Sequence, residues 1–236
     1  MEYKNVYFLG IGGIGMSALA RYFLHGGYAV AGYDRTPSHL TGELEAEGAA
    51  VHYEDDVRLI PEGFLDPKKT MVVYTPAVPQ DHGEYRYFRE HGFCVEKRSQ
   101  MLGHLAEGKY VMAVAGTHGK TTSTSMMTMM TIEAQMDPTV MVGSNLPAIG
   151  GTLRIGGKGC FVAESCEYTN SFLRFAPTVS VILNVEEDHL DFFKDINDII
   201  HSFHEFAELT PMNGLVVVNH DDQNAMRAVA HIDRRI

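Results

Sequence analysis

Short apolar runs alternate with stretches of helical composition along the first half of the chain. The apolar runs have the length of strands and lie at residues 5–9, 29–33, 50–53, 71–74 and 93–95. Helical composition is found at residues 14–25, 43–47 and 84–91, and glycine, a common helix stop, follows each of these stretches. Strands and helices in alternation predict a parallel sheet with helices on both faces.

The second half of the chain repeats this alternation. Strands are predicted at residues 110–115, 160–163, 179–183 and 215–218, and helices at residues 120–134 and 198–209. We expect Met126, Met127, Met129 and Met130 in the first of these helices to fill the core. The chain is therefore predicted to be an α/β protein with two domains, residues 1–107 and residues 108–236.

The composition is that of a globular protein. Of the 236 residues, 45% are hydrophobic and 21% are charged, which excludes disorder and coiled coil as the main class. The 19 basic and 30 acidic side chains give a net charge of −11, so the chain is a poor candidate for general nucleic-acid binding. A phosphate group would have to be held locally, by backbone amides and a few well-placed cations.

The cysteines and the N-terminal residues point to a cytoplasmic protein. Cys94, Cys160 and Cys166 lack C-x-x-C spacing, and their odd number argues against a disulfide framework. The first residues enter a strand-like run without the basic and long apolar segments of a signal peptide. No apolar run reaches the ~18 residues of a membrane span. We expect a soluble chain with reduced thiols.

A first glycine-rich turn follows the first predicted strand. Gly10-Ile11-Gly12-Gly13-Ile14-Gly15 fits G-x-G-x-x-G and opens a predicted helix, whose exposed amides and dipole favour a pyrophosphate. Asp34 ends the next predicted strand, where a Rossmann-like domain places the acid that binds a ribose hydroxyl. The motif leaves NAD, FAD and a nucleotide-sugar open as ligands.

A second glycine-rich turn is more specific. Gly116-Thr117-His118-Gly119-Lys120-Thr121-Thr122 lies between a predicted strand and a predicted helix, as a phosphate-binding P-loop does. Its amides would cradle phosphate oxygens, Lys120 would neutralise the terminal phosphates, and Thr121 could ligate Mg²⁺. The standard pattern would require glycine at position 114, which is Val114, so this loop is a variant. We expect it to bind ATP or GTP.

Acidic residues follow two strands that would flank this loop in a parallel sheet. Glu164 ends one predicted strand, and Glu167 follows it closely. The segment from Asn184 to Asp191 follows another and contains Asp188 and His189. The carboxyl ends of such strands are where open α/β sheets bind ligands, and Mg²⁺ prefers oxygen ligands.

Four motifs in this order resemble the Mur ligases, which build the peptide stem of bacterial peptidoglycan. They are the two glycine turns, residues 98–102 (RSQML) and residues 184–191 (NVEEDHLD), and the resemblance covers nearly the whole chain. It is strongest to the branch of the family that joins L-alanine to UDP-N-acetylmuramate. The resemblance implies a Rossmann-like N-terminal domain followed by a P-loop ATPase-type central domain.

The resemblance also implies ligands for individual residues. In the N-terminal domain, residues matching the family's UDP-N-acetylmuramate site are Gly12, Gly13, Gly15, Asp34, Thr75, Pro76, Ala77 and Val78. The diphosphate would face the three glycines, the ribose would face Asp34, and the uridine would face the segment from Thr75. In the central domain, Gly116 to Thr122 would bind ATP, while Thr121, Glu164 and His189 would hold two Mg²⁺ ions. Lys120, Glu164 and His189 would be the catalytic residues.

The implied reaction is an ATP-dependent amide ligation. ATP would phosphorylate the lactyl carboxylate of UDP-N-acetylmuramate, and the amine of L-alanine would displace the phosphate. The alternatives are the related ligase that recycles a murein peptide onto the same UDP-sugar, an NAD-dependent oxidoreductase, and a nucleotide-binding module without ligase activity. The oxidoreductase reading leaves the second glycine turn unexplained.

Two departures from the family pattern are visible. The family's central acidic stretch commonly reads E-A-D-E-S-D-x-S-F, and here Cys166 and Thr169 replace its two aspartates. Family members also have a third, C-terminal domain that supplies much of the amino-acid site. We expect that domain to be absent from this chain, and the chain alone to have little ligase activity.

Overall fold

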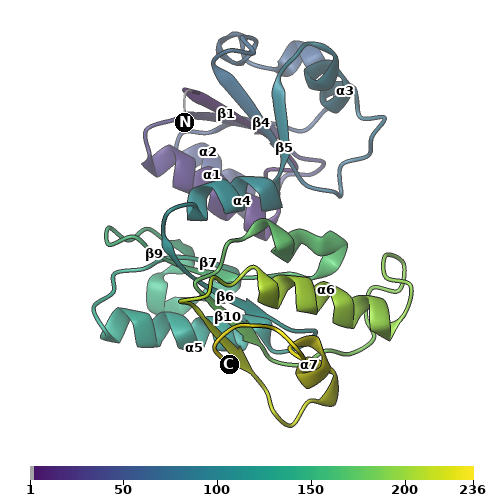
Figure 1. The fold of residues 1–236 in the computed structure, drawn as a ribbon. Helices are drawn as coiled ribbons and strands as arrows, with labels where there is room; N and C mark the ends of the chain where they lie inside the picture. The colour runs from purple at the N-terminus through teal and green to yellow at the C-terminus, as the bar shows by residue number, and fades with distance from the viewer. Residues whose placement is uncertain (1–2) are drawn as a thin grey trace. The chain divides into compact units, whose positions relative to one another are not determined.

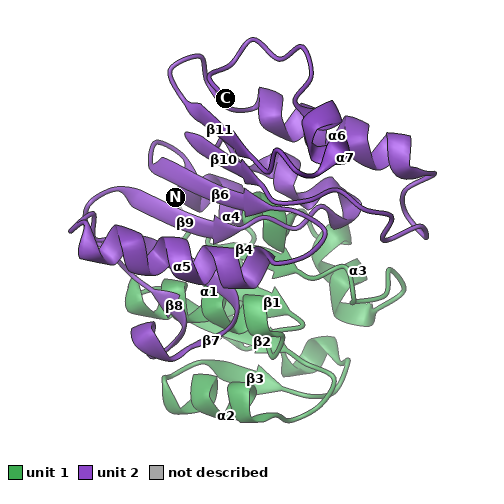
Figure 2. Ribbon diagram, turned by 90° about the horizontal axis from the view of Figure 1, so that it is seen from below, with its two compact units in different colours: residues 1–101 green, residues 102–236 purple. Residues whose placement is uncertain are grey.

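The computed structural model describes residues 3–236 and divides the chain into two compact units (Figure 2). Unit 1 extends to Met101 and unit 2 runs from Leu102 to Ile236. This division falls inside helix α4 (Arg98–Ala106), whereas the boundary predicted from the sequence follows that helix. Among the described helices, none is both long enough and apolar enough to cross a membrane.

Unit 1 is built on a parallel sheet of five strands in the order β3-β2-β1-β4-β5 (Figure 1 and Figure 2). Its strands are β1 (Asn5–Leu9), β2 (Ala29–Tyr33), β3 (Ala50–His52), β4 (Thr70–Tyr74) and β5 (Cys94–Lys97). Its helices are α1 (Ile14–His25), α2 (His39–Ala46), α3 (Gly83–Glu90) and the start of α4, with short 3₁₀ turns η1 (Val57–Leu59) and η2 (Glu62–Phe64). The parallel sheet predicted for this half is confirmed.

The strand order places a ligand-binding position in unit 1. β1 pairs with β2 on one side and with β4 on the other, so the chain reverses its direction of winding beside β1. In doubly wound sheets the crevice at such a point, outside the carboxyl ends of the strands, is where ligands bind. The loops that follow β1 and β4 therefore meet at this position.

A buried polar network lies in the core of unit 1. The Tyr7 hydroxyl oxygen lies 2.7 Å from Glu84 Oε2 and 2.7 Å from His52 Nε2. Glu84 is fully buried at the start of α3, and burial raises its pKa to about 7. Burial also lowers the pKa of His52 and of His82, which lies 3.3 Å from Asp55. These polar groups are packed among apolar side chains of β1, β4 and α3.

Unit 2 contains a sheet of six strands in the order β11-β10-β6-β9-β7-β8. Its strands are β6 (Tyr110–Ala115), β7 (Thr139–Leu146), β8 (Gly151–Arg154), β9 (Cys160–Glu164), β10 (Val179–Ile182) and β11 (Leu215–Val218). Its helices are the rest of α4, α5 (Lys120–Glu133), α6 (Ile196–Glu208) and α7 (Gln223–Ala228), with 3₁₀ turns η3 (Pro147–Ile149) and η4 (Tyr168–Arg174). β7 and β8 were not predicted, and β8 runs antiparallel to β7.

The central strand of this sheet carries the second glycine turn. β6 pairs in parallel with β10 on one side and with β9 on the other. Their carboxyl ends therefore lie beside the turn that follows β6, as the sequence predicted. This register brings Glu164, at the end of β9, opposite Val114 in β6.

Helix α5 buries threonines and exposes three of the four methionines that were predicted to fill the core. Thr124 and Thr128 are fully buried, and each donates its hydroxyl proton to the carbonyl four residues earlier at 2.8 Å. Met126, Met129 and Met130 are 62%, 44% and 62% exposed, so the prediction that they fill the core was wrong. Met127 is partly buried and packs against the core of unit 2, as predicted. Threonine can occupy this buried face because the helix backbone satisfies its hydroxyl group.

Candidate functional site

The turn after β6 requires glycine at two places. Gly116 has a φ of +149°, and a Cβ there would lie 2.9 Å from Leu183 Cβ. Gly119 has a φ of +80° and precedes the first residue of α5. Val114 is buried within β6, so the position that differs from the standard P-loop pattern belongs to the strand. The loop proper begins at Gly116.

The segment after β10 braces this loop through Asn184. The amide N–H of His118 donates to Asn184 Oδ1 at 2.8 Å, and Asn184 Nδ2 donates to the His118 carbonyl at 3.1 Å. The Thr117 N–H donates to the Asn184 carbonyl at 3.2 Å, and the Glu186 N–H donates to Thr117 Oγ1 at 2.9 Å. No role was predicted for Asn184. The available signals were its position directly after a predicted strand and its place at the start of the NVEEDHLD motif.

Lys120, the first residue of α5, turns back onto the loop and onto an acid. Its Nζ donates to the carbonyl of Gly116 at 2.5 Å and to that of Thr117 at 3.1 Å. It also lies 3.0 and 2.9 Å from the two carboxylate oxygens of Glu167, whose side chain is 3% exposed. Glu167 was noted in the sequence but was not among the predicted site residues.

Thr121 and Glu164 join the first turn of α5 to the end of β9. The Thr121 hydroxyl donates to Glu164 Oε1 at 2.8 Å, and the Gly143 amide donates to Glu164 Oε2 at 2.9 Å. A Cβ at Gly143 would lie 2.8 Å from that carboxylate, so glycine is needed for this approach. The structure thus brings together two of the three residues predicted to bind metal.

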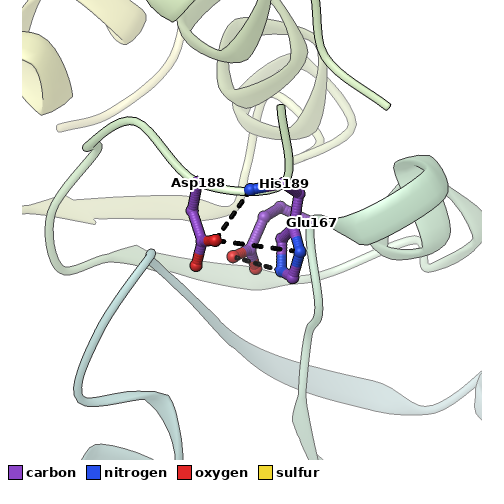
Figure 3. A group of neighbouring side chains, drawn as sticks. All are labelled: Glu167, Asp188 and His189. Atoms are coloured by element: carbon purple, nitrogen blue, oxygen red, sulfur yellow. Dashed lines mark hydrogen bonds and ion pairs between the residues drawn. The ribbon is translucent and has the colours of Figure 1, made fainter. Parts of the chain in front are cut away.

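The third predicted metal ligand lies in a different group. Glu167, Asp188 and His189 present ligand atoms that all lie within 4.8 Å of one another (Figure 3). His189 Nε2 lies 3.9 Å from Glu167, its Nδ1 lies 3.8 Å from Asp188, and its ring lies 4.5 Å from that of Tyr168. Glu167 therefore faces both Lys120 and this group.

The first glycine turn is closely packed in unit 1. The amide N–H of Gly12 donates to Asp34 Oδ2 at 2.6 Å, and a Cβ at Gly12 would lie 2.9 Å from the same oxygen. A Cβ at Gly15 would lie 2.6 Å from Arg98 Nη1, whereas a Cβ at Gly13 would lie 3.7 Å from its nearest neighbour, the Gly10 carbonyl oxygen. The structure therefore places Asp34 and a cation from α4 beside the start of α1.

The loop after β4 meets this turn. Gly10 has a φ of +85°, and a Cβ there would lie 2.5 Å from Thr75 Cγ2. The Thr75 N–H donates to the carbonyl of Leu9 at 3.2 Å, and the Val78 N–H donates to the carbonyl of Thr75 at 3.0 Å. Pro76 and Ala77, between them, are exposed. Apart from Gly15, which lies in the first turn of α1, the residues predicted to contact the UDP-sugar lie on the loops after β1, β2 and β4, at the carboxyl edge of the sheet.

Comparison with known proteins decides the family. The model of the Mur ligase family, catalytic domain, matches residues 5–110, and that of the Mur ligase middle domain matches residues 114–235. The chain belongs to the Mur ligase family. It is 45% identical over 231 residues to a UDP-N-acetylmuramate–L-alanine ligase of Clostridium novyi (strain NT), covering 98% of this chain and 49% of that relative.

Two solved structures of the family are also similar. The UDP-N-acetylmuramate–alanine ligase from Thermotoga maritima matches with a TM-score of 0.83 and 28% identity, covering 95% of this chain and 51% of that chain. The UDP-N-acetylmuramate:L-alanyl-gamma-D-glutamyl-meso-diaminopimelate ligase from Neisseria meningitides matches with a TM-score of 0.90 and 25% identity, covering 99% of this chain and 76% of that chain. The chain spans about half the length of the curated relatives it matches.

Proposed function

We propose that this chain provides the UDP-N-acetylmuramate site and the ATP site of a ligase that joins L-alanine to UDP-N-acetylmuramate. The observation that carries the proposal is the β6–α5 loop, where Lys120 and Thr121 face the acids Glu167 and Glu164. Such a loop indicates phosphate chemistry. The choice of substrates is supported by the names of the relatives, which are UDP-N-acetylmuramate–L-alanine ligases. Both substrates are cytoplasmic metabolites, so we place the reaction in the cytoplasm.

In unit 1 we assign the UDP moiety to the turn after β1. The amides at Gly12, Gly13 and Gly15 precede or open α1, where the helix dipole favours a diphosphate. Asp34 would then accept a hydrogen bond from a ribose hydroxyl while it holds the Gly12 amide. The segment Thr75-Pro76-Ala77, in contact with this turn, would line the uridine.

In unit 2 we assign ATP to the loop between β6 and α5. The residues proposed to contact ATP are Gly116, Thr117, His118, Gly119, Lys120, Thr121 and Thr122. The backbone amides would hold phosphate oxygens, and Lys120 would neutralise charge on the terminal phosphate. Asn184 would keep the His118 amide in place through its two hydrogen bonds.

The side chains around this loop fit Mg²⁺. The Thr121 hydroxyl and a Glu164 carboxylate oxygen lie 2.8 Å apart, and hard oxygen donors of this kind are the ligands Mg²⁺ prefers. Glu167, Asp188 and His189 offer a second group of two carboxylates and one imidazole. When bound there, Mg²⁺ would offset negative charge on the reacting phosphate and carboxylate.

The chemistry required of this chain is electrostatic. The γ-phosphate of ATP and the lactyl carboxylate are both anions, and their repulsion is the main obstacle to forming the acyl phosphate. Lys120 would offset it by donating to the phosphate, and Glu164 and His189 would act through the metal. The amine of L-alanine would then attack the acyl carbon, form the amide bond and release phosphate.

A second candidate is the ligase that attaches a murein peptide to the same UDP-sugar, because the Neisseria structure with that activity matches nearly the whole chain. The 45% identical relative is named for alanine, which favours the alanine ligase. Both reactions use the same two sites on this chain.

A ligation assay on the full-length protein tests the proposal. It supplies UDP-N-acetylmuramate, Mg²⁺-ATP and either L-alanine or the tripeptide L-alanyl-γ-D-glutamyl-meso-diaminopimelate, and detects the UDP-linked product by mass spectrometry. A product with L-alanine is expected. A product with the tripeptide alone would assign the chain to the recycling ligase, and no product with either would refute the proposed function.

A further inference from the structure

The ammonium group of Lys120 is fully engaged within unit 2. Its three protons face four acceptor atoms, namely the carbonyl oxygens of Gly116 and Thr117 and the two carboxylate oxygens of Glu167, at 2.5 to 3.1 Å. To donate to a phosphate, Lys120 has to release at least one of them. Among these acceptors Glu167 carries a full negative charge, so it competes most directly with a phosphate.

Glu167 itself cannot remain without a positive partner. It is 2% exposed, and a carboxylate buried to this degree is strongly destabilising when it is unpaired. In the structure its partner is Lys120 at 2.9 Å. Glu167 also groups with Asp188 and His189, whose ligand atoms lie within 4.8 Å of its own (Figure 3). A divalent cation held by this group would replace Lys120 as the partner.

Glu164 is held in a different way. Its two oxygens accept from the Thr121 hydroxyl and the Gly143 amide, which are neutral donors. The two acids beside the loop therefore differ in function. Glu164 is fixed to the loop and to β7, whereas Glu167 is the counter-ion of the lysine.

We propose that Glu167 is a positioning residue that holds Lys120 when no nucleotide is bound and exchanges it for a divalent cation when Mg²⁺-nucleotide binds. The inference rests on the proposed ATP site. It links two binding events through one carboxylate. Without the cation, a nucleotide has to separate Lys120 from Glu167 and leave a buried carboxylate close to its own phosphates. With the cation, Glu167 keeps a positive partner and Lys120 is free to reach the phosphate.

The test is the Mg²⁺ dependence of nucleotide affinity, measured with the fluorescent analogue mant-ATP in EDTA and in Mg²⁺. Glu167→Gln keeps the size of the side chain and removes its charge. In EDTA we expect this variant to bind mant-ATP roughly tenfold more tightly than wild type, because one unit of like charge near the phosphates is gone. In Mg²⁺ it should bind mant-ATP no more tightly than wild type does. The ratio of its dissociation constant in EDTA to that in Mg²⁺ is therefore expected to be smaller than the wild-type ratio.

Glu187→Gln is the matched control. Glu187 is an exposed acid in the segment after β10, and the same charge is removed without touching Lys120. Its ratio of dissociation constants should equal that of wild type. If Glu167→Gln shows the wild-type affinity in EDTA and the wild-type ratio, the inference is overturned while the proposed ATP site stands. If wild type fails to bind mant-ATP in Mg²⁺, the proposed function itself is overturned.

A reciprocal measurement keeps the inference testable if Glu167→Gln fails to fold. Lys120→Met removes the competitor of the cation for Glu167. Mn²⁺ alone, followed by electron paramagnetic resonance without nucleotide, should then bind roughly tenfold more tightly than to wild type. Lys158→Met, which removes an exposed lysine of the same unit, is the control. Equal Mn²⁺ affinity in wild type and Lys120→Met would overturn the inference.

Discussion

The buried carboxyl of Glu84 is expected to make the stability of unit 1 depend on pH. His52 Nδ1 faces the carbonyl oxygen of Glu54 at 3.0 Å and therefore carries a proton, because a carbonyl only accepts. The Tyr7 hydroxyl contacts both Glu84 and His52 but can donate its one proton to only one of them. The other contact needs a second proton, which that partner must carry. Burial raises the pKa of Glu84 and lowers that of His52, so we place this proton on Glu84.

The size of the effect follows from the pKa. Burial raises the pKa of Glu84 from 4.5 to about 7, so between these values the folded chain binds a proton that the unfolded chain releases. The stabilisation is full below pH 4.5 and is lost as the pH rises to about 7. At about 1.4 kcal/mol per pKa unit, the loss is roughly 3 kcal/mol. His52 and His82 act in the opposite sense, because their lowered pKa values cost stability on acidification.

The comparison of wild type with Glu84→Gln isolates this term, because both chains contain the two histidines. Urea unfolding is measured from pH 4.5 to pH 8, with hydrogen exchange of β1 peptides to report unit 1. The free energy of unfolding of Glu84→Gln, taken relative to wild type, should rise by roughly 3 kcal/mol between the low and the high end of this pH range. Val51→Ala, which removes methyl groups next to His52 and no titratable group, should show a constant difference. A constant difference for Glu84→Gln as well would refute the reasoning.

Three further predictions concern the two glycine turns and η4. Lys120→Ala leaves Glu167 buried without a cation and should cost roughly 3 kcal/mol in urea unfolding; adding Glu167→Gln should restore most of that stability but not mant-ATP binding. A Cβ at Gly12 would lie 2.8 Å from its nearest neighbour and one at Gly13 would lie 3.7 Å away. Gly12→Ala should therefore lose about 1–3 kcal/mol and weaken UDP-N-acetylmuramate binding in calorimetry, while Gly13→Ala stays within about 0.5 kcal/mol of wild-type stability. Thr169 is a β-branched residue with a φ of +54°, and Thr169→Asn should raise stability by about 1 kcal/mol; an unchanged or lower melting temperature would contradict this.

The sequence predicted where the two glycine turns and the acids beside the second turn lie, because these positions follow from strand order. Buried strands in this chain are short apolar runs, and ligand sites lie at their carboxyl ends. The positions of Lys120, Thr121 and Glu164 beside one another needed only that β9 neighbour β6. The pairing of Lys120 with Glu167 could not be predicted, because Glu167 lies between the end of β9 and the start of η4, where no strand register fixes its position.

Other elements carried weak or misleading signals. β7 is buried over its first half, but its second half is exposed and contains Gly143, so it lacks the apolar run of a strand. α4 follows β5 directly, with no intervening turn to mark its start. In α5 the methionine pattern indicated a core face, but Thr124 and Thr128 occupy that face because their hydroxyls bond to the helix backbone.

The identity of the ligand in unit 1 is the most direct test of the account. Thermal unfolding of the chain is measured with UDP-N-acetylmuramate, with NADH and with Mg²⁺-ATP in separate samples. A ligand present at 100 times its dissociation constant stabilises the folded state by about 2.7 kcal/mol, which is readily detected. We predict a higher melting temperature with UDP-N-acetylmuramate and with Mg²⁺-ATP, and an unchanged melting temperature with NADH. A shift with NADH and none with UDP-N-acetylmuramate would contradict it.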